Sequence, residues 1–231
     1  MNILQIINRA CVRAKMPALQ SVADSASAQA QEYLEYANQA NEFIIDYWNW
    51  RALCKDWSVT TTLNQIEIPL PEDYDGFLIN QIYDRTRNLW LKNCDDNVSL
   101  QNRAGKYMTD IPFWRVLGND IVFDFPLAAG RQLLLAYKSK YSVLDENNTA
   151  KELFEKDNDT YLLSDQVLIA GILYEKSKSY NDTDLEQNKQ AFLNLLDGHV
   201  EKDGPNRRIN IFGNMYNRIS PTEFQPYDGD L

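Results

Sequence analysis

The sequence is poor in the residues from which most active sites are built. Among 231 residues it has one histidine and only three cysteines, Cys11, Cys54 and Cys94, at wide and unrelated spacings. These cysteines match neither a disulfide framework nor a zinc site, and reduced thiols of a cytosolic protein are their plainest interpretation. A glycine-rich phosphate loop is also missing, because Gly105-Lys106 lacks the preceding glycine and the following Ser or Thr. We therefore expect no metal and no cofactor.

Positive charge and long apolar runs are scarce as well. With 23 basic and 33 acidic residues, the formal net charge is −10 and the pI about 4.6. This balance argues against a surface that neutralises nucleic-acid phosphates, which needs clustered Lys and Arg. No run approaches the roughly eighteen uninterrupted apolar residues of a membrane span. The start, MNILQIINRACVRAK, carries charges inside its apolar run and shows no cleavage pattern, so we predict neither a membrane segment nor a signal peptide.

The remaining candidates for catalysis are the lone histidine and one acidic turn. His199 lies near the end of a predicted helix, where an imidazole can bond free carbonyls or meet the helix dipole. Glu72, Asp73 and Asp75 would supply the paired carboxylates of a glycoside hydrolase, but PEDYDG is also the pattern of a solvated turn. A hydrolase is the competing class of function, and we expect no active site.

Two helices are predicted at the start of the chain. The first is capped by Asn2, ends before Pro17 and has one apolar face, made of Ile3, Ile6, Ile7, Ala10, Cys11 and Ala14. The second covers residues 25–53, which contain no glycine or proline, and would span about 43 Å. Asp24 or Ser25 would cap it, and its apolar stripe has one polar break: Leu34, Ala37, Asn41, Ile44 and Trp48. At its end, we expect Trp48 or Trp50 to be buried between helices and sheet.

From Asp56 to Tyr141 the pattern changes to the period of two that is typical of β-strands. Trp57, Val59, Thr61 and Leu63 alternate with polar residues, and the alternation resumes at Ile66, Ile68 and Leu70, which predicts a hairpin. Further strands are expected at residues 77–84, 89–92, 114–117, 121–125 and 133–141, with a short helix at 95–103. Gly118-Asn119 is a good two-residue turn between two of them.

Helices return in the last third of the chain. Ser164 would cap the segment DQVLIAGILYEKSKSY, and Thr183 with Glu186 forms a capping-box pattern before the last helix. Gly204-Pro205 would end that helix. The predicted fold is therefore α+β and mainly α. An antiparallel helical bundle (1–55 and 146–203) receives a small inserted antiparallel β region (56–145) and carries an extended C-terminal arm (204–231).

The 26 residues after Pro205 are rich in Asn, Pro and Gly, yet keep eight large apolar side chains. A purely solvating tail would not retain them. We predict that they contact a partner, with these residues as the binding set: Arg207, Arg208, Ile209, Phe212, Met215, Tyr216, Ile219, Phe224 and Tyr227. The alternative is that they wrap back onto their own subunit.

Several stretches carry a family resemblance through their order and spacing. They are LQIINRA, SVADSASAQAQEYLEYANQANEFIIDYWNWRAL, WSVTTTLNQIEIPLPEDYDGFL, FWRVLGNDIVFDFPLAAGRQLLLAYKSKY and YLLSDQVLIAGILYEKSKS. Together, over residues 2–203, they resemble the bacteriophage head-to-tail adaptor family, the head-completion or tail-accessory proteins of podophage-like viruses. In such adaptors a helix pair ends in Trp followed by Leu, as at Trp50 and Leu53, and a β segment closes on Leu-Pro-x-Asp-Tyr/Phe, as from Leu70 to Tyr74.

The resemblance implies a structural, non-enzymatic virion protein at the head-tail junction, assembled in the cytoplasm of the bacterial host. It would form a ring of about twelve copies on the portal protein. The ring would extend the channel through which genomic DNA passes without sequence-specific binding, and offer a platform to a tail or nozzle protein. Residues 206–231 would then be the portal-docking arm. The alternatives are a tail-associated hydrolase of cell wall or nucleic acid, and an assembly scaffold that never enters the virion.

Overall fold

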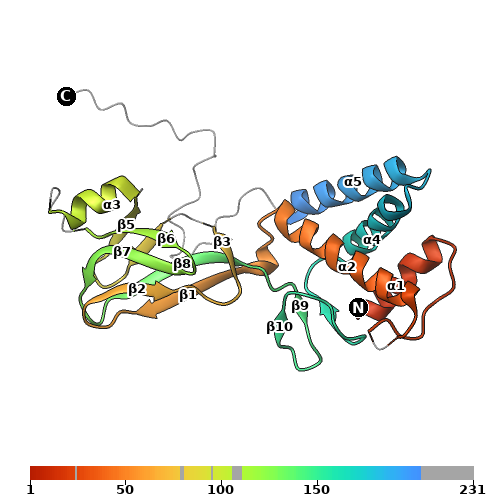
Figure 1. The fold of residues 1–231 in the computed structure, drawn as a ribbon, viewed down its shortest axis with the longest axis horizontal. Coiled ribbons are helices and arrows are strands. Elements are labelled where there is room, and N and C mark those ends of the chain that lie inside the picture. The colour runs from red at the N-terminus through yellow and green to blue at the C-terminus, as the bar shows by residue number, and fades with distance from the viewer. Residues whose placement is uncertain (24, 79–80, 95, 106–110, 204–231) are drawn as a thin grey trace.

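The computed structural model describes residues 1–23, 25–78, 81–94, 96–105 and 111–203, which form two lobes side by side (Figure 1). The helical lobe contains four helices and a three-stranded sheet. The β lobe contains an eight-stranded sheet and one further helix. The chain leaves the helical lobe along strand β1 and returns to it after strand β8, so the helical lobe is built from both halves of the chain.

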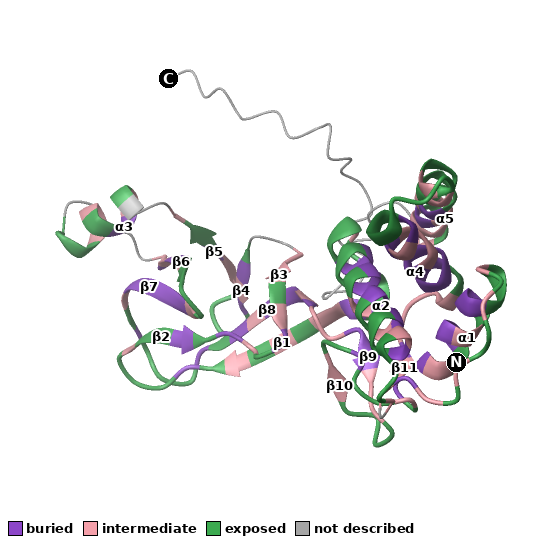
Figure 2. Ribbon diagram, turned by 45° about the vertical axis from the view of Figure 1, so that its right-hand side comes forward, coloured by how far each residue is buried: buried purple, intermediate pink, exposed green. Residues whose placement is uncertain are grey.

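Helix α4 (Asp165–Tyr180) is the centre of the helical lobe. It contacts α1 (Ile3–Arg13), α2 (Ala28–Tyr47) and α5 (Leu185–Asp203). Its first half is apolar on nearly every side, and Figure 2 shows buried residues where α2 and α4 face each other. Gly171 allows a close approach of α4 to α2, because a Cβ there would lie 2.8 Å from the Cβ of Ala40. The contact between α2 and α4 therefore requires glycine at this position.

A small sheet with strand order β10-β9-β11 completes this lobe. Its strands are β9 (Val143–Leu144), β10 (Ala150–Lys151) and β11 (Thr160–Tyr161). Asn41, the predicted polar break in the stripe of α2, is buried against the segment that carries these strands. Its amide donates to the Glu152 carbonyl (3.1 Å) and its oxygen accepts from the Ser142 hydroxyl (2.7 Å). The polar break thus fixes α2 to this segment through satisfied hydrogen bonds.

The large sheet has strand order β1-β8-β4-β5-β6-β7-β2, and β3 pairs with β8 beside β4. All pairs are antiparallel except β5 with β6, and helix α3 (Asp96–Arg103) lies against β7. A second core, separate from that of the helices, fills the sheet: Ile68, Leu70, Ile82, Leu91, Trp114, Ile121, Phe123, Leu127, Leu133 and Leu135. The strands are β1 (Cys54–Thr60), β2 (Gln65–Pro69), β3 (Tyr74–Phe77), β4 (Ile82–Asp84), β5 (Leu89–Asn93), β6 (Phe113–Leu117), β7 (Asp120–Leu127) and β8 (Gln132–Ser139).

The prediction of a mainly α helical bundle with a small β insertion is wrong. The chain has a mixed α/β fold dominated by the eight-stranded, curled sheet, with five α-helices among the described residues. Period-two alternation locates single strands, but it does not say how many of them join one sheet. Here every strand between Cys54 and Ser139 joins the same sheet and shares one core, so the β region is a full lobe.

The predicted hairpin between residues 57–63 and 66–70 is also wrong. Strand β1 pairs with β8 and β2 pairs with β7, so these consecutive strands lie at opposite ends of the sheet. Thr61 turns to the connection between β7 and β8: its amide donates to the Arg131 carbonyl (2.9 Å) and its hydroxyl to the Ala128 carbonyl (2.6 Å). The other predicted hairpin, β6 with β7 across Gly118 (φ +63°), is confirmed.

Helix α2 is shorter than the predicted 25–53. It ends at Tyr47, because Trp48 is extended (φ −152°, ψ 158°), and a 3-10 turn (Arg51–Leu53) leads to β1. The buried Trp50 folds back and its indole Nε1 donates to the Ile44 carbonyl (2.6 Å), which satisfies an end group of the helix. The aromatic run therefore closes the helix end where helix propensity alone predicts continuation.

The predicted caps had mixed outcomes. Asn2 forms a full capping box with Gln5, as expected for the first helix. Ser27, rather than Ser25, precedes α2, and Asp24 lies outside the described residues. Ser164 precedes α4 as predicted but its hydroxyl does not bond the helix amides. The Thr183 capping box is absent, since α5 begins at Leu185 and Thr183 bonds Asp182.

Asp73, in the turn between β2 and β3, joins that turn to strands β1 and β8. Its carboxylate accepts from the Tyr137 hydroxyl (2.8 Å), the Ser139 hydroxyl (2.7 Å) and the Lys55 ammonium (2.5 Å). Burial alone would raise the pKa of Asp73, but these hydrogen bonds outweigh it and hold the pKa below the ordinary value of an aspartate. The charged form of Asp73 is therefore part of the folded structure where the sheet meets the helical lobe.

The buried Trp50 gives a first prediction. Trp50→Ala should destabilise the protein by about 3–5 kcal/mol, as large aromatic truncations in cores do. Trp48→Ala should cost clearly less, because Trp48 is only partly buried. Trp50→Phe is the matched control, since it keeps an aromatic ring but loses the indole hydrogen bond, worth about 1 kcal/mol, and part of the buried ring volume. Urea unfolding measures all three, and equal effects at Trp48 and Trp50 would contradict the assignment.

Asp73 gives a pH-dependent prediction. Asp73→Asn should cost about 1–3 kcal/mol at pH 7, because it leaves Lys55 without its carboxylate partner. Since the folded pKa is lowered, the contribution of Asp73 is fully present above the unfolded pKa of about 3.9 and is lost as pH falls through the folded pKa. Unfolding from pH 7 to pH 3 should show the gap between the two proteins closing below about pH 4. A gap that stays constant with pH would rule out this ion-pair explanation.

Candidate interaction site at the junction of the lobes

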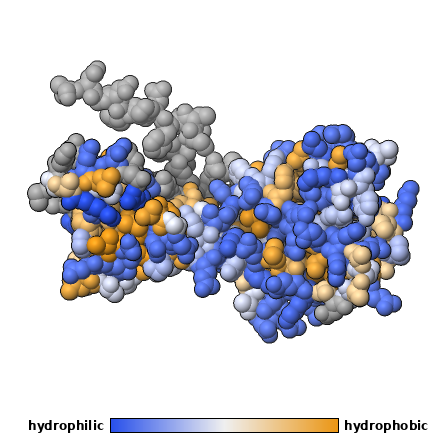
Figure 3. Space-filling view, viewed as in Figure 1, coloured by the Kyte–Doolittle hydropathy of each residue, from blue (hydrophilic) through white to orange (hydrophobic). Residues whose placement is uncertain are grey.

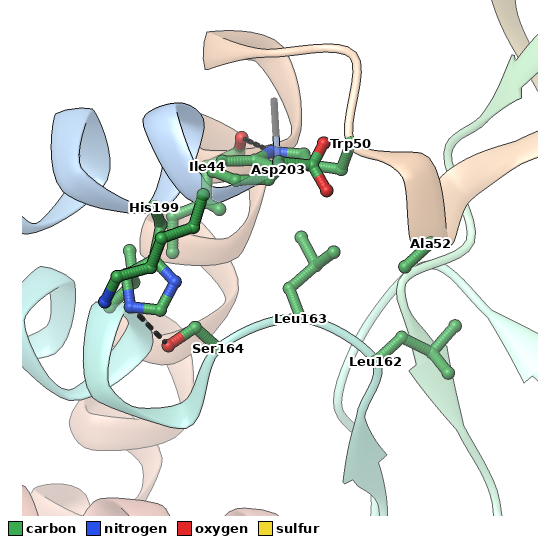
Figure 4. Close-up of a pocket in the computed structure, with 10 residues that line it drawn as sticks. Ile44, Trp50, Ala52, Leu162, Leu163, Ser164, His199 and Asp203 are labelled. Carbon is green, nitrogen blue, oxygen red and sulfur yellow. Dashed lines mark hydrogen bonds between the residues drawn. The ribbon is translucent and has the colours of Figure 1, made fainter. Parts of the chain in front are cut away.

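A pocket of about 270 Å³ opens where the helical lobe meets the start of β1 (Figure 4). The end of α5, the start of α4 and the segment between α2 and β1 form its walls. In Figure 4, Leu163 projects into the space below Trp50 and Asp203. The lining combines apolar side chains with polar groups at the start of α4 and the end of α5: Ile44, Trp50, Ala52, Leu162, Leu163, Ser164, Val167, His199, Lys202 and Asp203. A hollow that combines apolar side chains with a few polar groups is a candidate binding site.

Local hydrogen bonds fix each wall of the pocket. Trp50 is held by the Ile44 carbonyl, and the amide of Leu162 donates to the Ser142 carbonyl (3.0 Å). On the third side the Asp203 carboxylate accepts from the Arg51 amide (3.1 Å). The last residue of α5 is therefore bonded to the segment that enters β1, and the chain beyond α5 starts at the rim of this pocket.

Ser164 and His199 are the pair of side chains in the pocket that most resembles a nucleophile with its base. The Ser164 hydroxyl lies 3.2 Å from His199 Nε2. Burial, and secondarily the Lys202 ammonium, lower the pKa of His199, so its ring is neutral at pH 7 and can accept the hydroxyl proton. Within the described residues no carboxylate bonds the other ring nitrogen. The pair therefore lacks the third group that orients the base in a catalytic triad, and its hydrogen bond joins α4 to α5.

The acidic turn does not form a free carboxylate pair. Asp73 is buried in the bonds to Lys55, Tyr137 and Ser139, and Asp75 pairs with Lys138 (2.6 Å). Glu72 and Asp75 are exposed and Asp73 is buried, so the interpretation as a solvated turn holds for Glu72 and is wrong for Asp73. A glycosidase needs one carboxyl that is protonated and one that is free. Asp73 and Asp75 are instead each bound to a lysine.

Cys11 and Cys54 have environments that suppress thiol reactivity. Burial raises the pKa of Cys11, and burial raises the pKa of Cys54 to about 11, so both thiols are protonated at neutral pH. Across the described ranges no three His, Cys, Asp or Glu side chains are grouped so as to hold a metal ion. Among those same residues no helix is both long and apolar enough to cross a membrane.

Apolar side chains are also exposed outside the pocket. In Figure 3 they gather on the visible face of the β lobe, whereas the helical lobe shows mostly hydrophilic residues. The large apolar side chains exposed on the β lobe are Leu63, Ile66, Leu100, Val116 and Leu117. Beside Ile66 a second hollow, of about 570 Å³, lies between β2, β7 and α3, and Glu67, Arg103 and Asp124 contribute to its wall.

The predicted partner-binding residues lie outside the described residues, and so does Lys106. They are Arg207, Arg208, Ile209, Phe212, Met215, Tyr216, Ile219, Phe224 and Tyr227. Sequence reasoning missed the pocket itself, because its walls come from segments more than a hundred residues apart. One signal in the sequence pointed to it: a large aromatic side chain, Trp50, follows the helix by three residues and is expected to pack against the helix end.

Comparison with known proteins identifies the family of the chain. The model of the family described as SU10 adaptor protein matches residues 1–209, which include both lobes and all the described residues. No curated protein matches the chain. The resemblance to phage head-to-tail adaptors is thereby confirmed over most of the sequence. The chain belongs to the SU10 adaptor protein family.

Proposed function

We propose that this adaptor is a ring subunit that docks on the portal of a filled phage head, extends the DNA channel and carries the tail or nozzle protein. Membership of a family of phage structural proteins is the observation that carries the proposal. The finer parts follow from the resemblance: a ring of about twelve neighbouring copies, contact with portal and tail, and a place at the head-tail junction. Assembly would take place in the host cytoplasm.

The two-lobed subunit supports a ring. One lobe is a helix cluster and the other a curled sheet with its own core, so the subunit presents unlike surfaces at its two ends. Contact between unlike surfaces is heterologous, and it closes into a ring when the rotation between neighbours permits. Residues 1–55 with 146–203, and 56–145, are the proposed domains of this subunit, and 204–231 is its arm.

The charge of the chain supports a DNA channel rather than a DNA-binding site. A net charge of −10 gives little attraction to phosphates, and attraction would slow DNA that has to slide through a channel. The pocket also supports a structural role. Its Ser164–His199 pair lacks an orienting carboxylate among the described residues, which favours an adaptor over the alternative of a tail-associated hydrolase.

The third prediction tests docking by residues 206–231. Virions should contain about twelve copies of the full chain. A chain lacking residues 206–231 should fold, with helix content unchanged by circular dichroism, and should not attach to portal-bearing heads. Deletion of residues 228–231, which lie beyond Tyr227, is the matched control and should attach normally. Co-sedimentation with purified heads measures attachment.

Two outcomes would count against this function. A truncated chain that still sediments with heads removes the docking role of the arm. Complete virions that contain no copy of the chain would favour the other alternative, a scaffold that acts only during assembly.

The fourth prediction concerns the free protein. Because the contacts between copies are set by the portal, the isolated chain should be mainly monomeric at micromolar concentration. Docking then raises the effective concentration of neighbours and closes the ring. Light scattering on the pure protein, before and after addition of portal, measures this order. A stable large ring without portal would contradict it.

A further inference from the structure

One long edge of the β lobe is open. Among the residues that the structure describes, strand β1 pairs with β8 on one side and with no strand on the other. The alternation of hydrogen bonds between β1 and β8 shows which main-chain groups of β1 point away from β8. On β8, the carbonyls of Gln132 and Ala136 accept from the amides of Arg85 and Leu78, on the side away from β1. Because neighbouring residues of a strand point their main-chain groups to opposite sides, the residues of β8 that bond β1 are Leu133, Leu135 and Tyr137. Their partners in the register are Val59, Trp57 and Lys55.

The intervening residues of β1 therefore point their main-chain groups outward. These are Asp56, Ser58 and Thr60, and within the described residues no hydrogen bond reaches their amides or carbonyls. Their side chains are exposed, whereas Trp57 and Val59 on the other face are only partly buried against the sheet core. The edge thus offers both free ladder groups and incompletely covered apolar side chains. Such an edge is a template for one more strand.

The opposite edge of the sheet is protected in ways that β1 is not. Strand β2 contains Pro69, which has no amide hydrogen, and its register with β7 shifts between Gln65 and Glu67. Proline and bulges are the usual means by which proteins block an edge. The seven residues of β1 contain no proline, and their register with β8 is unbroken.

The chain itself supplies a strand-like segment beside the β1 edge. Helix α5 ends at Asp203, whose carboxylate accepts from Arg51, three residues before β1 begins. The following residues read Gly204-Pro-Asn and then RRINIF over 207–212, with Ile209 and Ile211 alternating with Arg208 and Asn210. Four residues from Asp203 to 207 reach about 14 Å, which covers the step from α5 to the start of β1.

From these observations we infer that residues 207–212 add to the open edge of β1 of the same chain as a parallel strand. Parallel pairing follows because both segments run away from the Asp203–Arg51 contact. Ile209 and Ile211 then cover Trp57 and Val59, and Arg208 lies on the exposed face near Asp56, where the opposite charges are favourable. The family match, which continues past α5 to residue 209, places the start of this segment in the part shared with the family.

The inference concerns the base of the arm and does not depend on what its remainder binds. Residues 213–231 would leave from the far end of β1, near the exposed Leu63, about 20 Å from the end of α5. The docking set beyond Phe212 would thus start from the β lobe. The pairing can be tested on the isolated full-length chain, so a failure to bind portal and a failure to pair are separate results.

Amide hydrogen exchange, read residue by residue by NMR, tests the pairing. In the full chain the amides of Asp56, Ser58 and Thr60 should exchange at least about tenfold more slowly than in a chain ending at residue 205. The amides of Lys55, Trp57 and Val59, which bond β8, should stay protected in both and report that the sheet is intact. A chain ending at residue 212 should behave like the full chain.

Point variants make the test specific to the segment. Ile209→Asp with Ile211→Asp should release the same three amides, whereas Ile219→Asp, an equal change farther along the arm, should not. Fast exchange of Asp56, Ser58 and Thr60 in the full chain would overturn the inference, and so would protection that persists in the chain ending at 205. Protection that disappears on dilution would also overturn it, since the added strand would then come from a second copy.

Discussion

The end of helix α2 sets how the two lobes meet. The last carbonyls of a helix have no partner within it, and in this protein the β lobe and its entry segment provide partners. Trp50 bonds the Ile44 carbonyl, and Lys138 of strand β8 donates to the Ile45 carbonyl at 3.3 Å while it pairs with Asp75. Asp73 then binds Lys55 and the two hydroxyls of β8. Three separate groups of polar contacts thus lie between the helix end and the sheet.

Much of the local structure could be predicted from sequence, because it depends on neighbours along the chain. The apolar face of α1, its capping box with Gln5 and the β6–β7 turn at Gly118 all follow from residues a few positions apart. What failed depends on distant partners. The pairing of β1 with β8 joins residues 72 to 84 positions apart, and period-two alternation in β1 is the same whichever strand lies beside it. Hence most strands of the β lobe were predicted, but the strand predicted at 77–84 corresponds to two strands, β3 and β4, and the single large sheet was not predicted.

The candidate site also shows the difference between features that depend on sequence neighbours and features that depend on distant residues. His199 was recognised as lying near a helix end, but its partner Ser164 was assigned to the cap of another helix. The Asp73 turn has the composition of a solvated loop, and only the tertiary structure brings Lys55, Tyr137 and Ser139 to it. Polar residues in a turn look alike whether water or the protein satisfies them. A buried aspartate in such a turn can be identified only when its donors are known.

The discontinuity of the helical lobe has a consequence for how the protein is made. Helices α1 and α2 leave the ribosome first, but the helix that fills the space between them, α4, starts only at Asp165, after the whole β lobe. Until then Ile6, Ala37 and Ile44 have no core to enter. Long-range contacts of this kind form slowly, and exposed apolar faces invite association meanwhile. The β lobe can form its own core earlier, and its strands β1 and β8 then hold the two ends of the helical lobe together, which shortens the search by which that lobe closes.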